Sequence, residues 1–340
     1  MNATMLDRRR FLLGLGAAAL TLAGCNASAG SGDPASSASS AAAGFAWTDA
    51  RGTAIDLPAV PKTIVAQSSA AAALWDFGIE VAGAYGELAT DANGKLNYQA
   101  GNLDLSRLTV LGKTYGEFDL EKFAAMNPEL LVDLSFDNKT LWYVPEKSLA
   151  QVEKISPTLG MTMLDLNLLE IIQEFSKLAG GLGADQSAAA VTDAKAAFEA
   201  SVQQVKDAVA ANPGITALGI SRTADKAWIA NAKQHPDFAY LQTLGVKFVP
   251  AGGKETDYFT EISYEELDRY SGDVIFDDAR SPETQQASDR VAVWSSLPGV
   301  KAGQVHDWKA AAPYSYLANA PIFADFAGAL ANAKKVVDAG

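Results

Sequence analysis

The chain has 340 residues, with 27 Lys and Arg against 40 Asp and Glu and a formal net charge of -13. An acidic surface repels nucleic acid, so a nucleic-acid-binding role is disfavoured. The single cysteine excludes an internal disulfide and a cluster of thiolate metal ligands. Apolar residues make up 49% of the sequence, which is enough for two hydrophobic cores.

The first 24 residues have the pattern of an export signal that ends in a lipid attachment site. Arg8, Arg9 and Arg10 precede an apolar run over residues 11–23, which is shorter than the ~20 helical residues that span a bilayer core. The segment 22–25 (LAGC) resembles the bacterial lipobox, in which the cysteine thiol is diacylated and the cysteine becomes the new N-terminus. We therefore expect a lipid on Cys25 and a protein anchored on the extracytoplasmic face of the cell membrane. The arginines favour twin-arginine export, and the ordinary secretory route stays open.

Residues 25–44 are rich in Ser, Ala and Gly and cannot bury enough apolar surface to offset the entropy of ordering. We expect a flexible tether there, with a typical reach of ~25 Å from the membrane.

Short strands and helices alternate from residue 45 onward. Apolar runs at 62–66 and 81–85 predict buried strands, and residues 70–77 predict a helix that ends at Gly78. This alternation is typical of an α/β fold, in which helices flank a mainly parallel sheet.

One helix-strand unit occurs twice in the chain. Residues 119–126 predict a helix and 129–134 a strand, and the same order returns at 263–270 and 273–277. The repeat predicts two lobes built to one plan.

The longest helical pattern, over residues 185–211, lies between the two copies. Its apolar residues recur at helical spacing, and Asn212-Pro213-Gly214 ends it. A helix of this length predicts a rigid bridge between an N-terminal lobe over 45–184 and a C-terminal lobe over 212–340, which closes with a helix. Such a bridge would limit lobe closure. The alternative is an ordinary crossover helix within one α/β unit.

Short motifs follow one another over nearly all of the chain after the tether. They are Asp49-Ala50-Arg51-Gly52, Leu57-Pro58, Pro61-Lys62-Thr63-Ile64-Val65, Pro128-Glu129-Leu130-Leu131, the segment 155–158 (ISPT), and Trp294, Leu297-Pro298, Val300, Gly303 and Val305. Their order resembles the substrate-binding proteins of bacterial ABC importers for ferric siderophores, haem and cobalamin.

The resemblance implies a binding protein, and not an enzyme, with two Rossmann-like lobes joined by one long helix and a ligand in the cleft between them. It also implies a monomer that docks on a membrane permease through one surface glutamate in each lobe. Glu121 and Glu265 match those positions and occupy equivalent places in the two repeats. Charge complementarity of this kind steers and orients an encounter.

The histidine content limits the choice of ligand. Binding proteins for Zn²⁺ or Mn²⁺ use several imidazoles and carboxylates, whereas this chain has only His235 and His306. Both are expected in turns or at the surface, so direct metal capture is disfavoured. Haem needs an axial His, Tyr or Met, and the tyrosines leave haem open, with cobalamin, as an alternative.

A ferric siderophore needs no metal ligand or cofactor from the protein, because the chelator already fills the coordination sphere of the iron. Aromatic rings would pack on its linkers, and Arg or Tyr would donate to its oxygens. Arg280, Tyr316, Trp142 and Arg222 are the strongest candidates, since the first two match positions typical of siderophore binders. All the candidates lie in predicted loops after strands, and they are Tyr85, Tyr115, Phe136, Trp142, Tyr143, Arg222, Trp228, Tyr258, Arg280, Trp308, Tyr314 and Tyr316.

The chain departs from the pattern of catecholate binders, which gather three basic residues around a strongly anionic complex. The first-lobe loop over 134–139 has no arginine. A pocket with few cations and many aromatics favours a neutral ferric hydroxamate. Lys113 or Lys139 would weaken this preference if either side chain turned inward.

A surface-anchored hydrolase is the remote alternative. The sequence has no nucleophile elbow, Walker loop, zinc-protease helix or dinucleotide glycine pattern after a strand. Asp277 and Asp278 resemble a catalytic carboxylate pair, but neighbouring residues on a strand point to opposite faces.

Overall fold

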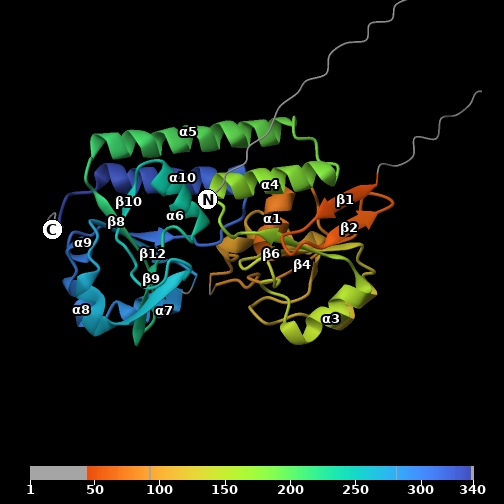
Figure 1. Ribbon diagram of the computed structural model, residues 1–340, viewed down its shortest axis with the longest axis horizontal. Helices are drawn as coiled ribbons and strands as arrows, with labels where there is room; N and C mark the ends of the chain where they lie inside the picture. Colours follow the sequence, from red (N-terminus) through yellow and green to blue (C-terminus); the bar gives the residue numbers. More distant parts are fainter. Residues whose placement is uncertain (1–43, 92, 281, 338–340) are drawn as a thin grey trace, which may run out of the picture. The chain divides into compact units, whose positions relative to one another are not determined.

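Figure 1 shows the computed structural model of the chain, which describes residues 44–91, 93–280 and 282–337. The expected signal segment 1–24, Cys25 and nearly all of the expected tether lie outside these ranges. Within them, no helix combines the length and the apolar character needed to cross a membrane.

The N-terminal lobe contains a parallel sheet with the strand order β5-β4-β3-β6-β7. Its central strands β3 and β6 are buried along their whole length, as both faces of a parallel sheet are covered. An antiparallel hairpin of β1 and β2 precedes the sheet. The strands are β1 (Phe45–Thr48), β2 (Ala54–Leu57), β3 (Ile64–Gln67), β4 (Gly83–Tyr85), β5 (Thr109–Val110), β6 (Leu130–Ser135) and β7 (Thr158–Thr162).

The helices of this lobe confirm the alternation expected from the sequence. The first, α1, has four consecutive alanines that are fully buried, and the Gln67 side chain accepts hydrogen bonds from its first turn. The helices are α1 (Ser68–Asp76), α2 (Leu120–Ala125), α3 (Glu146–Ile155) and α4 (Leu168–Gly181), with 3₁₀ turns η1 (Tyr98–Ala100) and η2 (Leu105–Arg107).

The C-terminal lobe contains a mixed sheet with the order β11-β9-β8-β12-β13, and β10 pairs with β8 as well. Three of its five strand pairings are parallel, as expected for a mainly parallel sheet, and the two pairings of β9 are antiparallel. Strands β8 and β9 are joined by a short turn, which permits only antiparallel pairing, and β11 then pairs antiparallel with β9. The strands are β8 (Thr216–Arg222), β9 (Lys226–Ala230), β10 (Lys247–Phe248), β11 (Phe259–Ser263), β12 (Val274–Asp278) and β13 (Val305–Trp308).

The remaining elements of this lobe are short except for the last helix. They are α6 (Pro236–Thr243), the 3₁₀ helix η3 (Tyr264–Arg269), α7 (Pro282–Ser288), α8 (Ala292–Ser296), α9 (Pro298–Lys301) and α10 (Tyr316–Asn332).

The expected repeat is present in both sheets. Strands β3, β6 and β7 lie side by side and parallel, and β8, β12 and β13 repeat that order. A carboxylate just before the repeated strand accepts backbone N–H groups at the start of its neighbour: Glu129 from Thr63 at 3.0 Å and Asp273 from Thr216 at 2.9 Å. The second copy of the repeated helix, η3, is a 3₁₀ helix and not the α-helix that we expected.

The long helix α5 (Ala189–Ala211) runs along both lobes, with α10 beside it (Figure 1). It begins at Ala189 and not at residue 185, because the Asp185 carboxylate accepts from the Ser187 N–H and closes a separate turn. At the far end, the Asn212 side chain donates to the carbonyl oxygens of Leu330 and Ala331. The C-terminal ends of α5 and α10 are therefore joined by hydrogen bonds.

A second connection between the lobes is the segment that links β13 to α10. The Ser69 hydroxyl donates to the Ala311 carbonyl at 2.7 Å, and the Tyr98 hydroxyl donates to the Ala310 carbonyl at 2.9 Å. The Ser315 hydroxyl donates to the Asp76 carboxylate at 2.6 Å. This segment and α5 together resist a large hinge motion of the lobes.

Candidate ligand-binding cavity

A cavity of about 250 Å³, partly open to solvent, lies between the lobes. The N-terminal lobe contributes Phe136, Trp142 and Leu168 to its wall. The C-terminal lobe contributes aromatic and polar side chains together with a run of three alanines at 310–312. The wall is thus mainly apolar, with a small number of polar groups, as is usual for sites that bind small molecules.

The N-terminal wall is formed by the loop that follows β6. The rings of Phe136 and Trp142 meet edge to face, with centroids 4.8 Å apart. The Asp137 carboxylate accepts the N–H groups of Lys139 and Thr140, which folds the loop back on itself. Two rigid aromatic surfaces are thereby presented to the cavity.

Tyr258 joins the two lobes at the cavity. Its hydroxyl donates to the Phe136 carbonyl at 3.0 Å, and the two rings meet edge to face at 5.8 Å. Burial raises the pKa of Tyr258 to about 12, so its hydroxyl stays protonated at neutral pH.

The C-terminal wall contains Trp308, at the end of β13, and two buried titratable groups. The Trp308 indole N–H donates to the Asp237 carboxylate at 2.5 Å, and burial raises the pKa of Asp237 to about 6. Burial lowers the pKa of His235 to about 4, so this imidazole is neutral at pH 7, and its Nε2 donates to the Tyr258 carbonyl at 2.9 Å. His235 lies in the bend before α6, but its ring is buried against Trp308 and Phe259, so the expectation of a surface position is wrong.

Arg280 supplies a guanidinium to the wall, directly after β12. Its Nε lies 3.0 and 2.9 Å from the two carboxylate oxygens of Asp278, and its Nη2 also donates to that carboxylate. Burial opposes the charged form, but Asp278 outweighs it and raises the pKa of Arg280. Among the described residues, no hydrogen-bond partner is found for Nη1. The pair is therefore nearly neutral as a whole, with donors left for a ligand.

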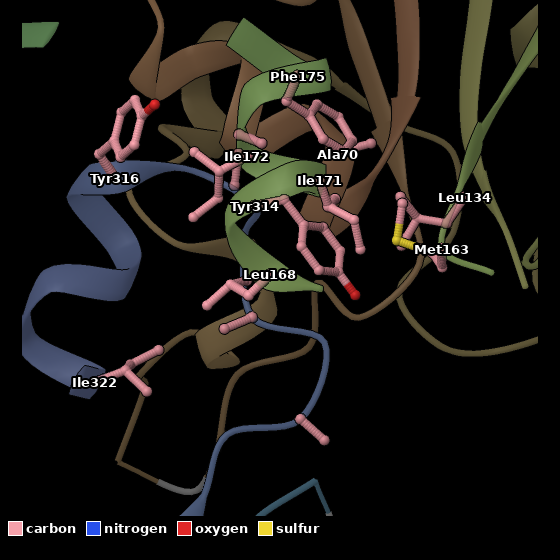
Figure 2. Close-up of a cluster of buried hydrophobic side chains, with 14 of the residues drawn as sticks. Ala70, Leu134, Met163, Leu168, Ile171, Ile172, Phe175, Tyr314, Tyr316 and Ile322 are labelled. Carbon is pink, nitrogen blue, oxygen red and sulfur yellow. The ribbon is translucent and has the colours of Figure 1, made fainter. Parts of the chain in front are cut away.

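Tyr314 lines the cavity between β13 and α10. Its ring stacks on Phe175 of α4, with centroids 5.8 Å apart and an interplanar angle of 10°. In Figure 2 its hydroxyl is directed away from Phe175. Within the described part of the chain this hydroxyl has no hydrogen-bond partner, and burial raises its pKa. It is thus available as a donor.

Five of the predicted site residues meet in the cavity wall. They are Phe136, Trp142, Arg280, Trp308 and Tyr314. Tyr258, also a candidate, lies with them.

The structure corrects the expected position of Tyr316. It is the first residue of α10, and its ring packs against Phe77 of α1 and Phe198 of α5 at 6.0 and 5.7 Å. Figure 2 shows it apart from Tyr314. The sequence places Tyr316 near the cleft but does not give the face of the helix on which it lies.

Three other candidates also lie away from the cavity. The Tyr85 ring packs in the N-terminal core beside Phe118, at 4.9 Å. Arg222 is buried in ion pairs with Asp277 and Asp289. Trp228 lies on β9, where it pairs with a residue of β11. All three lie within strands, and not in the loops after strands where we expected them.

Tyr143 and Tyr115 lie behind Trp142. The Tyr143 ring meets Trp142 at 4.5 Å, and its hydroxyl donates to Glu87 at 2.9 Å. Tyr115 meets Tyr143 at 5.1 Å and is 68% exposed. Neither lines the cavity.

The other candidate groups are at the surface. Glu121, in the first turn of α2, and Glu265, in the first turn of η3, are both exposed. Lys113 and Lys139 are also exposed and do not line the cavity.

No group of three or more His, Cys, Asp or Glu side chains that could hold a metal ion occurs in ranges 44–91, 93–280 and 282–337. The polar cavity residues that the sequence did not indicate are His235, Asp237, Lys309 and Asn319. His235 and Asp237 flank Pro236, the first residue of α6, and reach the wall through the packing of that helix.

A two-lobed α/β chain with a cavity between the lobes belongs to the class of solute-binding proteins. A family model described as periplasmic binding protein matches residues 81–312. The chain is therefore a member of the periplasmic binding protein family, as the resemblance of its motifs implied.

Solved structures agree with this membership. DesE, a ferric-siderophore receptor protein from Streptomyces coelicolor, is 39% identical, with a TM-score of 0.81 over 86% of this chain and 100% of that chain. The siderophore periplasmic binding protein from the fuscachelin gene cluster of Thermobifida fusca is 25% identical, with a TM-score of 0.53 over 80% and 98%. SirA of Staphylococcus aureus, complexed with staphyloferrin B, shares the fold at 19% identity, with a TM-score of 0.61 over 85% and 99%. Comparison with curated proteins gives no match.

Proposed function

We propose that this protein captures a ferric siderophore and delivers it to an ABC importer permease for iron uptake. The observation that carries the proposal is the cavity between the lobes, whose wall combines aromatic rings with a few hydrogen-bond donors. The 39% identity with a ferric-siderophore receptor supports the same ligand class.

A ferric hydroxamate is the favoured ligand because the wall carries little net positive charge. Arg280 pairs with Asp278, and Lys309, which also lines the cavity, pairs with Asp325, while Asp237 adds a further carboxylate. A trianionic ferric catecholate would lose its hydration without gaining enough positive charge from such a wall. A neutral complex needs only donors, which Arg280 and Tyr314 supply.

Haem and cobalamin bind to other members of the same class of importer proteins and are the competing ligands. His235 is in the wall, but its Nε2 is engaged by the Tyr258 carbonyl. Axial ligation of haem through that nitrogen would require breaking this contact. Axial ligation through Tyr258 or Tyr314 would need the phenolate, which burial disfavours by raising the pKa of both hydroxyls. The siderophore is therefore favoured over haem.

Delivery and anchoring complete the proposal. Glu121 and Glu265 are the residues proposed to meet arginines of the permease, since both are exposed and precede equivalent strands. Acylation at Cys25 would hold the protein at the extracytoplasmic face of the cell membrane. We propose that it acts there as a monomer without enzymatic turnover.

Mass spectrometry of the protein isolated under non-denaturing conditions from iron-starved source cells tests this function. The expected result is a complex whose added mass carries the isotope pattern of iron and whose released ligand is a hydroxamate. Recovery of haem, of a corrinoid or of a catecholate complex would overturn the assignment.

A further inference from the structure

The loop that carries Phe136 and Trp142 returns from the cavity over a buried carboxylate. Asp133, in β6, is fully buried. Its Oδ2 accepts the N–H of Tyr143 at 3.1 Å and the N–H of Val144 at 3.3 Å. These two residues directly follow Trp142, so the carboxylate holds the end of the wall loop against the strand from which the loop departs.

Tyr85 holds the same carboxylate from β4. Its hydroxyl donates to Asp133 Oδ2 at 2.9 Å, and Oδ1 accepts the N–H of Leu134 at 2.7 Å. Burial raises the pKa of Asp133 to about 7, and the hydrogen bonds from Leu134, Tyr143, Tyr85 and Val144 oppose this rise. Removing the acceptor would leave several buried donors without partners, which destabilises the present position of the loop.

The C-terminal lobe has an equivalent arrangement. Asp277 occupies in β12 the position that Asp133 occupies in β6. The Nε of Arg222 donates to Asp277 at 3.2 Å, and its Nη2 donates to Asp289 at 3.0 Å. These two aspartates lie before and after Arg280 in the sequence. The aspartate at this place in the repeat is thus buried in both lobes, but Asp133 accepts N–H groups of the returning loop, whereas Asp277 pairs with the side chain of Arg222.

We propose that Asp133 is a positioning residue for ligand binding, which with Tyr85 fixes the loop that presents Phe136 and Trp142 to the ligand. The choice of ligand rests on the proposed function. The role of Asp133 in holding the loop does not depend on it. Asp133 itself does not line the cavity.

Four variants separate positioning from general stability. Asp133→Ala removes all the acceptors, whereas Asp133→Asn can place its carbonyl where Oδ2 lies and keep three of the four bonds. Tyr85→Phe removes one hydroxyl beneath the loop. Tyr264→Phe is its matched control, because the Tyr264 hydroxyl donates to the Thr223 carbonyl at 2.7 Å, away from the cavity.

Two measurements are made on each variant of the folded protein. The first is the dissociation constant for ferrioxamine B, a ferric hydroxamate. The second is hydrogen exchange at Tyr143 and Val144 in the ligand-free protein. We expect about tenfold weaker binding for Asp133→Ala, about threefold for Tyr85→Phe, recovery of most of the affinity for Asp133→Asn, and no change for Tyr264→Phe. Exchange at both amides should become faster in the same order.

Unchanged affinity, or unchanged exchange at these amides, in folded Asp133→Ala would overturn the proposal. If that variant does not fold, the comparison of Tyr85→Phe with Tyr264→Phe decides in the same way. A wild-type protein that does not bind ferrioxamine B would count against the hydroxamate function alone. The exchange rates would still decide whether Asp133 and Tyr85 hold the loop.

Discussion

Arg280 is the cavity residue for which the side-chain geometry is most specific. Asp278 engages its Nε and Nη2, and Arg280 lines the cavity with further N–H donors. A guanidinium fixed in this way loses little conformational entropy when it donates to oxygens of a ligand.

Replacing Arg280 with glutamine should weaken the binding of ferrioxamine B by about 10- to 100-fold, as expected for lost hydrogen bonds from a charged donor. The double variant R280Q/D278N corrects for the carboxylate that the single change leaves unpaired. Arg269→Gln is the matched control, since Arg269 pairs with Glu266 at the surface. Titration calorimetry measures all three, and equal affinities would contradict the assigned role.

His235 makes a testable contribution to the pH dependence of stability. Burial lowers its pKa to about 4 in the folded protein, against about 6.5 in an unfolded chain. The unfolded state therefore binds the proton more readily, and the stability associated with a neutral His235 is present above pH 6.5 and lost as the pH falls towards 4. Burial raises the pKa of Asp237 to about 6, so protonation of Asp237 adds stability as the pH falls over part of the same pH range.

Comparison of the wild type with His235→Gln isolates the histidine, because Asp237 is present in both proteins. The free energy of unfolding of the wild type relative to the variant should fall by about 3 kcal/mol between pH 7 and pH 4. Urea denaturation at the two pH values measures it. A difference that does not change with pH would show that His235 is not buried as a neutral ring.

The sequence predicts the position of a single side chain well when the residue directly follows the end of a strand. Phe136 and Arg280 follow the equivalent strands β6 and β12, and both reach the cavity. The prediction for Tyr316 is wrong because this residue begins α10. On a helix, a shift of one residue along the sequence decides whether a side chain faces the cavity or α5. His235 was missed because only the packing of α6 brings it to the wall.

Among the elements, the repeated units carry the two glutamates proposed to dock on the permease. Glu121 lies in α2 and Glu265 in η3, and these helices precede the equivalent strands β6 and β12. Docking at both would place the two lobes over two sites of a dimeric permease.

Charge reversal at both positions, E121K with E265K, should reduce iron uptake by more than about tenfold and leave the affinity for the ferric ligand unchanged, because neither residue lines the cavity. Asp193→Lys, at an exposed position of α5, is the control for the change in net charge. Uptake of radioactive iron by complemented cells measures the effect. Full uptake with normal affinity would exclude the docking role of these residues.

The elements themselves were largely predictable, since buried apolar runs and helix-breaking residues fix their existence. The short 3₁₀ helix η3 was not, because only six residues separate β11 from the turn before β12, and a tight helix fits that distance. The antiparallel pairing of β9 and β11 depends on a turn that the alternation of elements does not reveal.

For the whole molecule, we propose that a lipid on Cys25 attaches the protein to the membrane. Cys25→Ala should release the protein into the aqueous phase on detergent phase separation and abolish labelling with palmitate, with no change in ligand affinity. The unmodified protein should partition into detergent. Membrane retention of the cysteine-free protein would contradict the lipoprotein assignment.

The two connections between the lobes, α5 and the segment before α10, should hold the cavity close to its present size, because they resist hinge motion. Selectivity should therefore follow the charge of the wall, where Arg280 is balanced by Asp278. The repeat in the sequence was enough to predict the two lobes. It did not predict the ion pair of Arg280 with Asp278, because that pair depends on the directions of the two side chains.

Titration of the protein with a ferric hydroxamate, a ferric catecholate and haem, followed by quenching of tryptophan fluorescence, tests the central claim most directly. Trp142 and Trp308 lie in the cavity wall, so a bound complex should quench them. The account predicts saturable quenching by the hydroxamate at concentrations at least about tenfold lower than by either of the others. Tighter binding of the catecholate or of haem would contradict it.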